Sequence, residues 1–118
     1  MTYMLLIIEP RGQREARSEA EGRQAYATME AWADSLKARG VLHAYSSLRG
    51  DSEGKRVQSR NGKQRVHDGP FTEAREMVGG FFLVDCATLD DALELAATCP
   101  AAEWASVEVR ETGPCYLR

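Results

Sequence analysis

The hydrophobic residues of this chain fall into short unbroken runs separated by polar turns. Residues 3–8 form one run, Tyr-Met-Leu-Leu-Ile-Ile, which Pro10 and Gly12 bring to a stop. Residues 81–84, Phe-Phe-Leu-Val, form a second run directly after two glycines, within a segment 80–85. Because neighbouring side chains of a strand point to opposite faces, both runs predict strands that are covered on both sides.

The segment 13–39 has the pattern of a long amphipathic helix. Its apolar stripe recurs at helical spacing and consists of Ala25, Met29, Trp32 and Leu36. Ser18 and Glu21 have the spacing of a capping box, which is one possible start for the firm part of the helix. Gly40 supplies the usual left-handed stop. The side chains of such a stripe usually pack in the hydrophobic core. The alternative is that Met29 and Trp32 line a ligand pocket.

Three further elements are shorter. Residues 41–48 predict a weakly patterned strand, and alternation over residues 106–110 predicts a half-exposed one. Thr88 is the expected cap of a second helix, which ends by Cys99-Pro100.

A polar hairpin is expected between the two halves of the chain. Residues 55–59 and 64–66 flank Asn61-Gly62, the strongest short hairpin signal present. The arms are polar at most positions, so we expect them to face solvent as an edge. A turn at 68–71 follows, and residues 72–78 predict one irregular turn rather than a helix.

The order strand–helix–strand, hairpin, strand–helix–strand predicts a ferredoxin-like α+β fold, in which an antiparallel sheet carries both helices on one face. Residues 1–118 are expected to form a single domain. The strands at 3–8 and 80–85 are also apolar on the other face, where exposure forfeits about 1.5–3 kcal/mol for each large side chain. We therefore expect a homodimer that packs through the open sheet face.

The composition of the chain argues against several classes of function. The net charge of −3 and the dispersal of the twelve arginines among acidic residues argue against nucleic-acid binding. No run approaches the roughly 20 apolar residues of a membrane span, and the first run is too short for an export signal. Three cysteines without CxxC spacing are typical of reduced, mostly buried thiols. A cytoplasmic protein without membrane contact is expected.

The turn around residues 67–73 concentrates the candidate chemistry. Asp68 is a candidate general base if it is partly desolvated, and the alternative is that it caps the backbone N–H groups of the turn after Phe71. Histidine is the residue type suited to proton transfer near neutral pH, so His67 is the candidate partner of Asp68, with a solvated loop histidine as the alternative. The charges of Glu73, Arg75 and Glu76, close to Phe71, are candidates for binding an acidic or hydroxylated small molecule, with Arg75 as a bidentate donor. The alternative is that they only form surface ion pairs.

A second set of candidates lies on the predicted sheet. The space between sheet and long helix is expected to open as a pocket, near the candidate ligand-binding residues Tyr3, Glu9, His43, Tyr45 and Arg49. Strand alternation places His43 and Tyr45 on one face, either as a catalytic pair or as a structural one. The two histidines stand 24 positions apart and no nucleotide-binding motif occurs, so we expect neither a metal nor a cofactor.

His67-Asp68-Gly69-Pro70-Phe71, with Glu73, Glu76 and Gly79-Gly80-Phe81, resembles the DGPF signature of the YCII-related family. Segments 3–8, 39–42 and 107–110 also have counterparts there. The resemblance implies a ferredoxin-like fold and a dimeric, α/β-barrel-like assembly. The family typically has Lys where Arg75 stands, so the positive charge is kept. Some members are small lyase-type enzymes, and some carry a His–Asp pair with the His on the first helix, where this chain has none.

Two functions from different classes follow. The first is a small-molecule-binding or accessory protein, since DGPF-type proteins resemble partners of extracytoplasmic-function sigma factors. The second is a cofactor-independent enzyme, lyase- or hydrolase-like, with Asp68 as its base. The binding role is favoured because these residues do not assemble a complete catalytic constellation.

Overall fold

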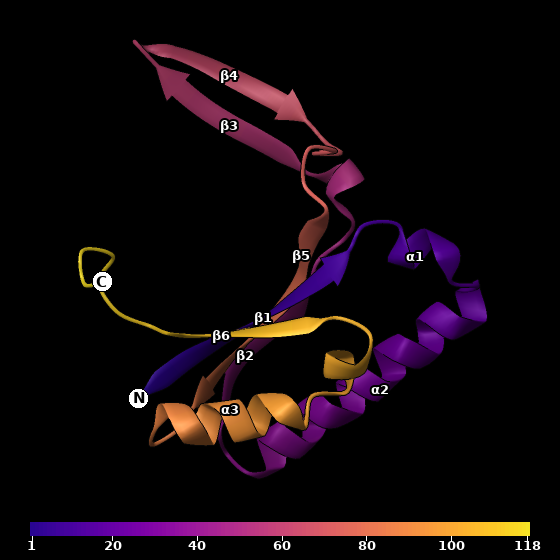
Figure 1. The fold of residues 1–118 in the computed structure, drawn as a ribbon, viewed down its shortest axis with the longest axis vertical. Coiled ribbons are helices and arrows are strands. Elements are labelled where there is room, and N and C mark those ends of the chain that lie inside the picture. Colours follow the sequence, from indigo (N-terminus) through magenta and orange to yellow (C-terminus); the bar gives the residue numbers. More distant parts are fainter.

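The computed structural model describes residues 1–118 as one α+β unit (Figure 1). Its strands are β1 (Thr2–Pro10), β2 (Leu42–Ser47), β3 (Lys55–Arg60), β4 (Lys63–Asp68), β5 (Glu76–Asp85) and β6 (Ser106–Glu111). Its helices are α1 (Gln13–Ala16), α2 (Glu19–Ala38) and α3 (Leu89–Ala97), with short 3-10 helices at Asp51–Glu53 and Pro100–Glu103. None of the helices combines the length and apolar character needed to cross a bilayer.

The main sheet has the order β2-β5-β1-β6, and every neighbouring pair is antiparallel. The central pair therefore joins the first strand of each half of the chain. Side chains of both α2 and α3 share one buried cluster with those of β1 and β5, so both helices lie on the same face. The ferredoxin-like prediction is confirmed.

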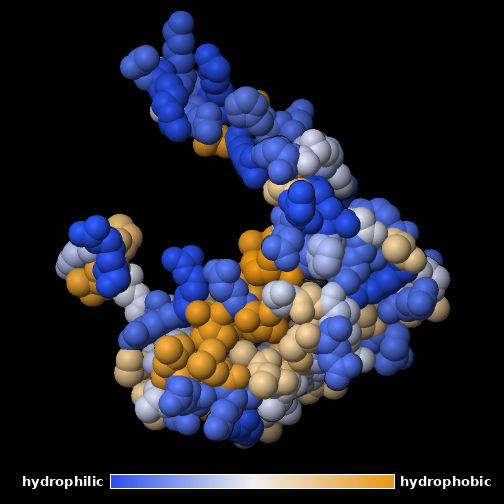
Figure 2. Space-filling model, viewed as in Figure 1, coloured by the Kyte–Doolittle hydropathy of each residue, from blue (hydrophilic) through white to orange (hydrophobic).

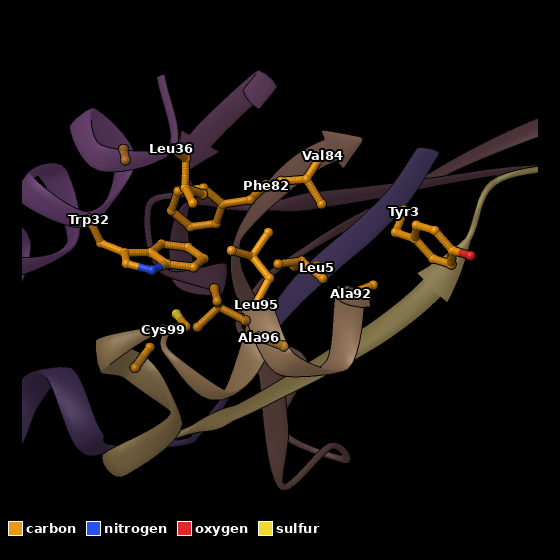
Figure 3. Close-up of a cluster of buried hydrophobic side chains, with 13 residues drawn as sticks. Tyr3, Leu5, Trp32, Leu36, Phe82, Val84, Ala92, Leu95, Ala96 and Cys99 are labelled. Carbon is orange, nitrogen blue, oxygen red and sulfur yellow. The ribbon is translucent and has the colours of Figure 1, made fainter. Parts of the chain in front are cut away.

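The core forms where the alternate residues of β1 meet the helices (Figure 3). Tyr3, Leu5 and Ile7 are buried on this face. Trp32 of α2 meets Phe82 of β5 edge to face, with ring centroids 4.8 Å apart and planes at 74°. This packing is the edge-to-face arrangement that aromatic quadrupoles favour.

The opposite face of the sheet remains open. It presents the other residues of the same strands, a strip made of Met4, Leu6, Ile8, Val78, Phe81 and Leu83. All but one of these side chains are only half-buried, and Val78 is 43% exposed. The sequence pattern is thus correct that both faces are apolar, but a single chain covers only one of them.

Three boundaries differ from the sequence prediction. The first helix is broken at Arg17, whose backbone is extended, and restarts at the Ser18–Glu21 capping box, which is formed. Residues 76–79 belong to β5, since residues 76–78 pair with residues 8–10 of β1 and Gly79 lies at a shift in the register. His67 and Asp68 lie in β4 rather than at a turn, since the hairpin arms pair as far as Lys55 and Asp68.

The hairpin β3–β4 is a separate two-stranded sheet that projects from the body, and we call residues 55–68 the arm (Figure 1). Asn61 and Gly62 have φ of 53° and 76°, as a two-residue hairpin turn of this sequence requires. Every residue of the arm is exposed. The radius of gyration is 16.1 Å, whereas a compact domain of this length has about 13.5 Å. The excess comes from the arm and from residues 112–118 after β6, which we call the C-terminal tail.

The close approach of β2 to β5 gives the first testable prediction. A Cβ at Gly80 would lie 2.8 Å from the backbone oxygen of Ser46. We expect Gly80→Ala to lower the free energy of unfolding by about 1–3 kcal/mol, measured by urea titration. Gly22→Ala in α2, where a Cβ meets nothing within 4 Å, is the control. It should be neutral or stabilising by up to about 1 kcal/mol, and equal stabilities for all three proteins would contradict this strand packing.

Candidate functional site

A pocket of about 310 Å³ opens between the N-terminal half of α2 and the sheet. Its apolar lining comes from both layers and includes Ile7, Met29, Phe82 and Trp104. Its charged or hydroxyl-bearing lining includes Glu9, Arg14, Arg17, Tyr26, Glu30 and Tyr45. An apolar cavity with a few polar groups is the usual form of a small-molecule site, and this volume suits a single ring.

One end of the pocket is built on an ion pair. Glu9 is only 6% exposed, and its two carboxylate oxygens accept from Nε and Nη2 of Arg14 at 2.9 and 2.8 Å. Nη1 of Arg14 donates to the carbonyl of Leu48 at 2.7 Å. Gly79 makes room for this pair, since a Cβ there would lie 1.7 Å from Oε1 of Glu9. The carboxylate is therefore held by the protein itself.

The opposite end carries a carboxylate and two phenols. The hydroxyl of Tyr45 donates to Oε2 of Glu30 at 2.8 Å, and Nζ of Lys37 donates to the same hydroxyl at 3.4 Å. The Tyr45 ring stacks on Phe82, with centroids 5.4 Å apart. The negative charge of Glu30 raises the pKa of Tyr26, which keeps that phenol protonated and able to donate.

Arg17 is the cation of this pocket whose guanidinium makes no hydrogen bond within the chain. It lies over the ring of Trp104, with Cζ 5.6 Å from the centroid. The extended backbone of Arg17, between α1 and α2, separates it from the regular helix. Sequence reasoning missed Arg17 and Trp104 because 87 positions separate them and neither carries a local motif.

The sheet candidates divide into two groups. Glu9 and Tyr45 line the pocket, and their role in ligand binding stays a prediction. Tyr3 is 1% exposed in the core and does not line it, and burial raises its pKa. Arg49 is exposed and pairs with Glu53 at 3.3 Å.

His43 does not share a face with Tyr45, contrary to the alternation argument. The pairing of β2 with β5 shifts register between Leu42 and Ala44, so a bulge at His43 breaks the alternation. Nε2 of His43 instead lies 2.7 Å from Oδ2 of Asp85, at the exposed end of β5.

The turn of the DGPF motif is held by hydrogen bonds to Asp51, not to Asp68 as the sequence suggested. Asp51 forms two hydrogen bonds with Arg11, one of them 2.9 Å long, and accepts from the N–H of Phe71 at 3.4 Å. Arg11 also donates to the carbonyl of Phe71 at 2.6 Å. Gly69 is required here because a Cβ would lie 1.7 Å from the Asp51 carbonyl oxygen. This cluster joins the arm to the body.

Asp68 stands apart from this cluster and from the pocket. Its exposed carboxylate accepts from Nζ of Lys55 at 2.5 Å, across the hairpin. That hydrogen bond lowers the pKa of Asp68, which makes it a weaker base. His67 lies opposite Arg56 in the same ladder and is exposed. Catalysis by His67 and Asp68 stays a prediction, and neither residue lines the pocket.

The other candidate residues of the turn make their contacts where the arm joins the body. Glu73 pairs with Arg56 at 2.5 Å, and its own backbone hydrogen bond and Arg56 lower its pKa. The guanidinium of Arg56 lies 3.8 Å from the centroid of the Phe71 ring. The carbonyl of Arg75 accepts from the N–H of Arg11 at 2.9 Å, and Glu76 begins β5. Their role in ligand binding stays a prediction.

The antiparallel sheet, the two helices on one face and the pocket between these layers define a ferredoxin-like α+β domain with a ligand-sized cavity. The chain belongs to the YCII-related domain family, whose model matches residues 1–114. The resemblance to the YCII-related family is thereby confirmed.

The chain is also similar to two known proteins, one in sequence and one in fold. It is 30% identical over 96 residues to an uncharacterized protein of Rhizobium meliloti (strain 1021), covering 81% of this chain and 77% of that protein. Its fold is similar to that of 5-chloro-2-hydroxyhydroquinone dehydrochlorinase (TftG) from Burkholderia phenoliruptrix AC1100, solved with 2,5-dihydroxybenzoquinone. That match has a TM-score of 0.57 and 14% identity, and covers 96% of this chain and 94% of the other. At this identity the likeness establishes the fold.

The ion pair at the end of the pocket gives a second prediction. We expect Arg14→Met to destabilise the fold by about 1–3 kcal/mol, because it leaves the buried Glu9 carboxylate without a partner. Glu9→Gln together with Arg14→Met should cost less than the sum of the single changes. Urea unfolding of all four proteins measures this coupling, and strictly additive effects would contradict it.

Asp51, where the arm joins the body, gives a prediction about how the stability of the fold depends on pH. Hydrogen bonding to Arg11 lowers the pKa of Asp51 below 3.8, so its contribution to stability is present above that value and is lost as pH falls through the folded-state pKa. We expect Asp51→Asn to be less stable than wild type at pH 7, and the difference to shrink below about pH 4. Urea midpoints between neutral and acid pH measure it. A difference that stays constant with pH would rule this contribution out, and the exposed Glu53→Gln is the control.

Proposed function

We propose that the protein binds a small, ring-sized polar molecule in the pocket between α2 and the sheet. The observation that carries this proposal is the mixed lining of the pocket, in which apolar side chains from the helix and the sheet stand beside a few charged and hydroxyl-bearing groups. A ligand gains burial from the walls and orientation from the ends.

The groups that remain available indicate the class of ligand. Arg17 offers an unpaired guanidinium beside Trp104, which suits a carboxylate or phenolate on a planar ring. At the other end, Glu30 and the two tyrosines suit a hydroxyl. A hydroxylated aromatic acid or quinone meets both requirements, and the structural neighbour TftG was solved with such a ring, 2,5-dihydroxybenzoquinone.

The pairing of the pocket carboxylates favours binding over acid–base catalysis. Glu9 is held by Arg14, and Glu30 accepts from Tyr45, so neither is a free base. A cofactor-independent enzyme with Asp68 as base is the alternative, and its residues lie outside this pocket. An accessory role beside a sigma factor rests on the family resemblance alone.

We also propose that the protein acts as a homodimer joined through the open sheet face. The support is the apolar strip of Met4, Leu6, Ile8, Val78, Phe81 and Leu83, which one chain leaves half-covered. A second copy has the same strip, and a two-fold axis brings one against the other.

Binding is tested with 4-hydroxybenzoate, catechol and 2,5-dihydroxybenzoquinone by isothermal titration. We expect wild type to bind at least one of them. Ala25→Leu, which adds bulk to the pocket wall, should weaken binding about tenfold or more, corresponding to about 1.4 kcal/mol. Ala27→Leu makes the same change at an exposed position of α2 that does not line the pocket, and should bind as wild type does.

The variants also separate the two ends of the pocket. Arg17→Gln should weaken 4-hydroxybenzoate more than catechol, because only the former carries a carboxylate. If none of the three molecules binds wild type, the proposed ligand class is wrong. If Ala25→Leu binds as tightly as Ala27→Leu, the site lies elsewhere.

A further inference from the structure

The arm differs in charge from the rest of the chain. Residues 55–68 contain five lysines and arginines and one acid, a net charge of +4 with His67 neutral. The whole chain carries −3, so removing the arm leaves −7 for the remaining residues. Figure 2 shows the arm as an almost wholly hydrophilic projection.

The hairpin register sorts these charges onto one face. Three cross-strand pairs, which share a face by alternation, hold four cations between them: Arg56 with His67, Gln58 with Arg65, and Arg60 with Lys63. The other face holds Lys55 with Asp68, Val57 with Val66, and Ser59 with Gln64. Three of the twelve arginines are therefore clustered here, contrary to the expectation that all of them are dispersed.

The outer cations of this basic face have no acidic partner within the chain. Lys63 and Arg65 form no ion pair, and Arg60 reaches only the backbone oxygen of Ser59, at 3.0 Å. Arg56, nearer the body, is already bound to Glu73. The unpaired charges thus lie toward the tip.

A hairpin of this kind gains little from its own contacts. An isolated two-stranded hairpin is only marginally stable in water. The arm is held at its base by Arg11, Asp51 and Phe71, while Val57 and Val66 remain 60% and 54% exposed. A surface outside the protomer that complements the basic face would order it.

We propose that the arm is a clasp for a second copy of this chain, its basic face lying on the acidic body of the partner. The inference rests on the homodimer proposed above. Complementarity favours this occupant, because a body of −7 attracts the arm and repels a polyanion such as DNA. In Figure 2 apolar surface gathers on the body in the hollow bounded by the arm and the C-terminal tail, so a copy seated there lies within reach of the arm.

Two double variants with equal charge change test the clasp. Arg60→Gln with Arg65→Gln removes two charges from the basic face, and Ser59→Glu with Gln64→Glu adds two negative charges to the opposite face of the same strands. Sedimentation equilibrium of the full chain at low and high salt gives each dimer dissociation constant. We expect the first variant to raise the constant about tenfold at low salt and to flatten its salt dependence, and the second to stay within about twofold of wild type.

The outcomes separate the clasp from the dimer. If wild type dimerises and both double variants shift the constant equally, or neither does, the clasp is wrong and the dimer stands. If wild type sediments as the 13.1 kDa monomer at every concentration, both proposals fail. If the dimer is unaffected but the basic-face variant abolishes a gel shift of duplex DNA by wild type, the arm serves nucleic acid and the clasp is overturned.

Discussion

β1 and β5 pair antiparallel from Thr2 with Asp85 to Pro10 with Glu76, and this ladder fixes the position of nearly everything else. One face of the ladder presents Leu5 and Phe82 to the helices. Its far end brings Gly79 beside Glu9, where the missing side chain admits the carboxylate and, with it, Arg14. The core and the pocket are therefore two parts of one face, filled where α2 and α3 both cover it and hollow toward the N-terminal half of α2.

The same ladder explains why the two candidate chemical regions are separate. The pocket lies on the helix face of the sheet, whereas Asp68 and His67 extend with β4 away from the body. Between them, Asp51 and Arg11 hold the turn that follows β4. The DGPF segment thus acts as a joint between body and arm, which accounts structurally for its dense turn residues without requiring that they meet a ligand.

Charge and hydrophobicity point to the same kind of partner. The open strip on the sheet needs an apolar surface, and the basic arm needs an acidic one. A second copy of the chain offers both at once, because each protomer carries the strip and a strongly negative body. The association would also bring two pockets into one particle, each lined by residues of a single chain.

Local patterns in the sequence determined the elements and their order. The unbroken apolar runs, the Ser18 capping box and Asn61-Gly62 act over a few residues, so the fold class and the hairpin followed from them. The family followed from the short motif at residues 67–71 and the double glycine after it. The tertiary structure alone decided which residues meet. The bulge at His43 reversed an alternation argument, and Arg17 reached Trp104 only through the packing of α2. Asp51, and not Asp68, accepts the hydrogen bond from the turn at Phe71. The reason is the same, since contacts between distant segments depend on register and packing, which no local pattern encodes.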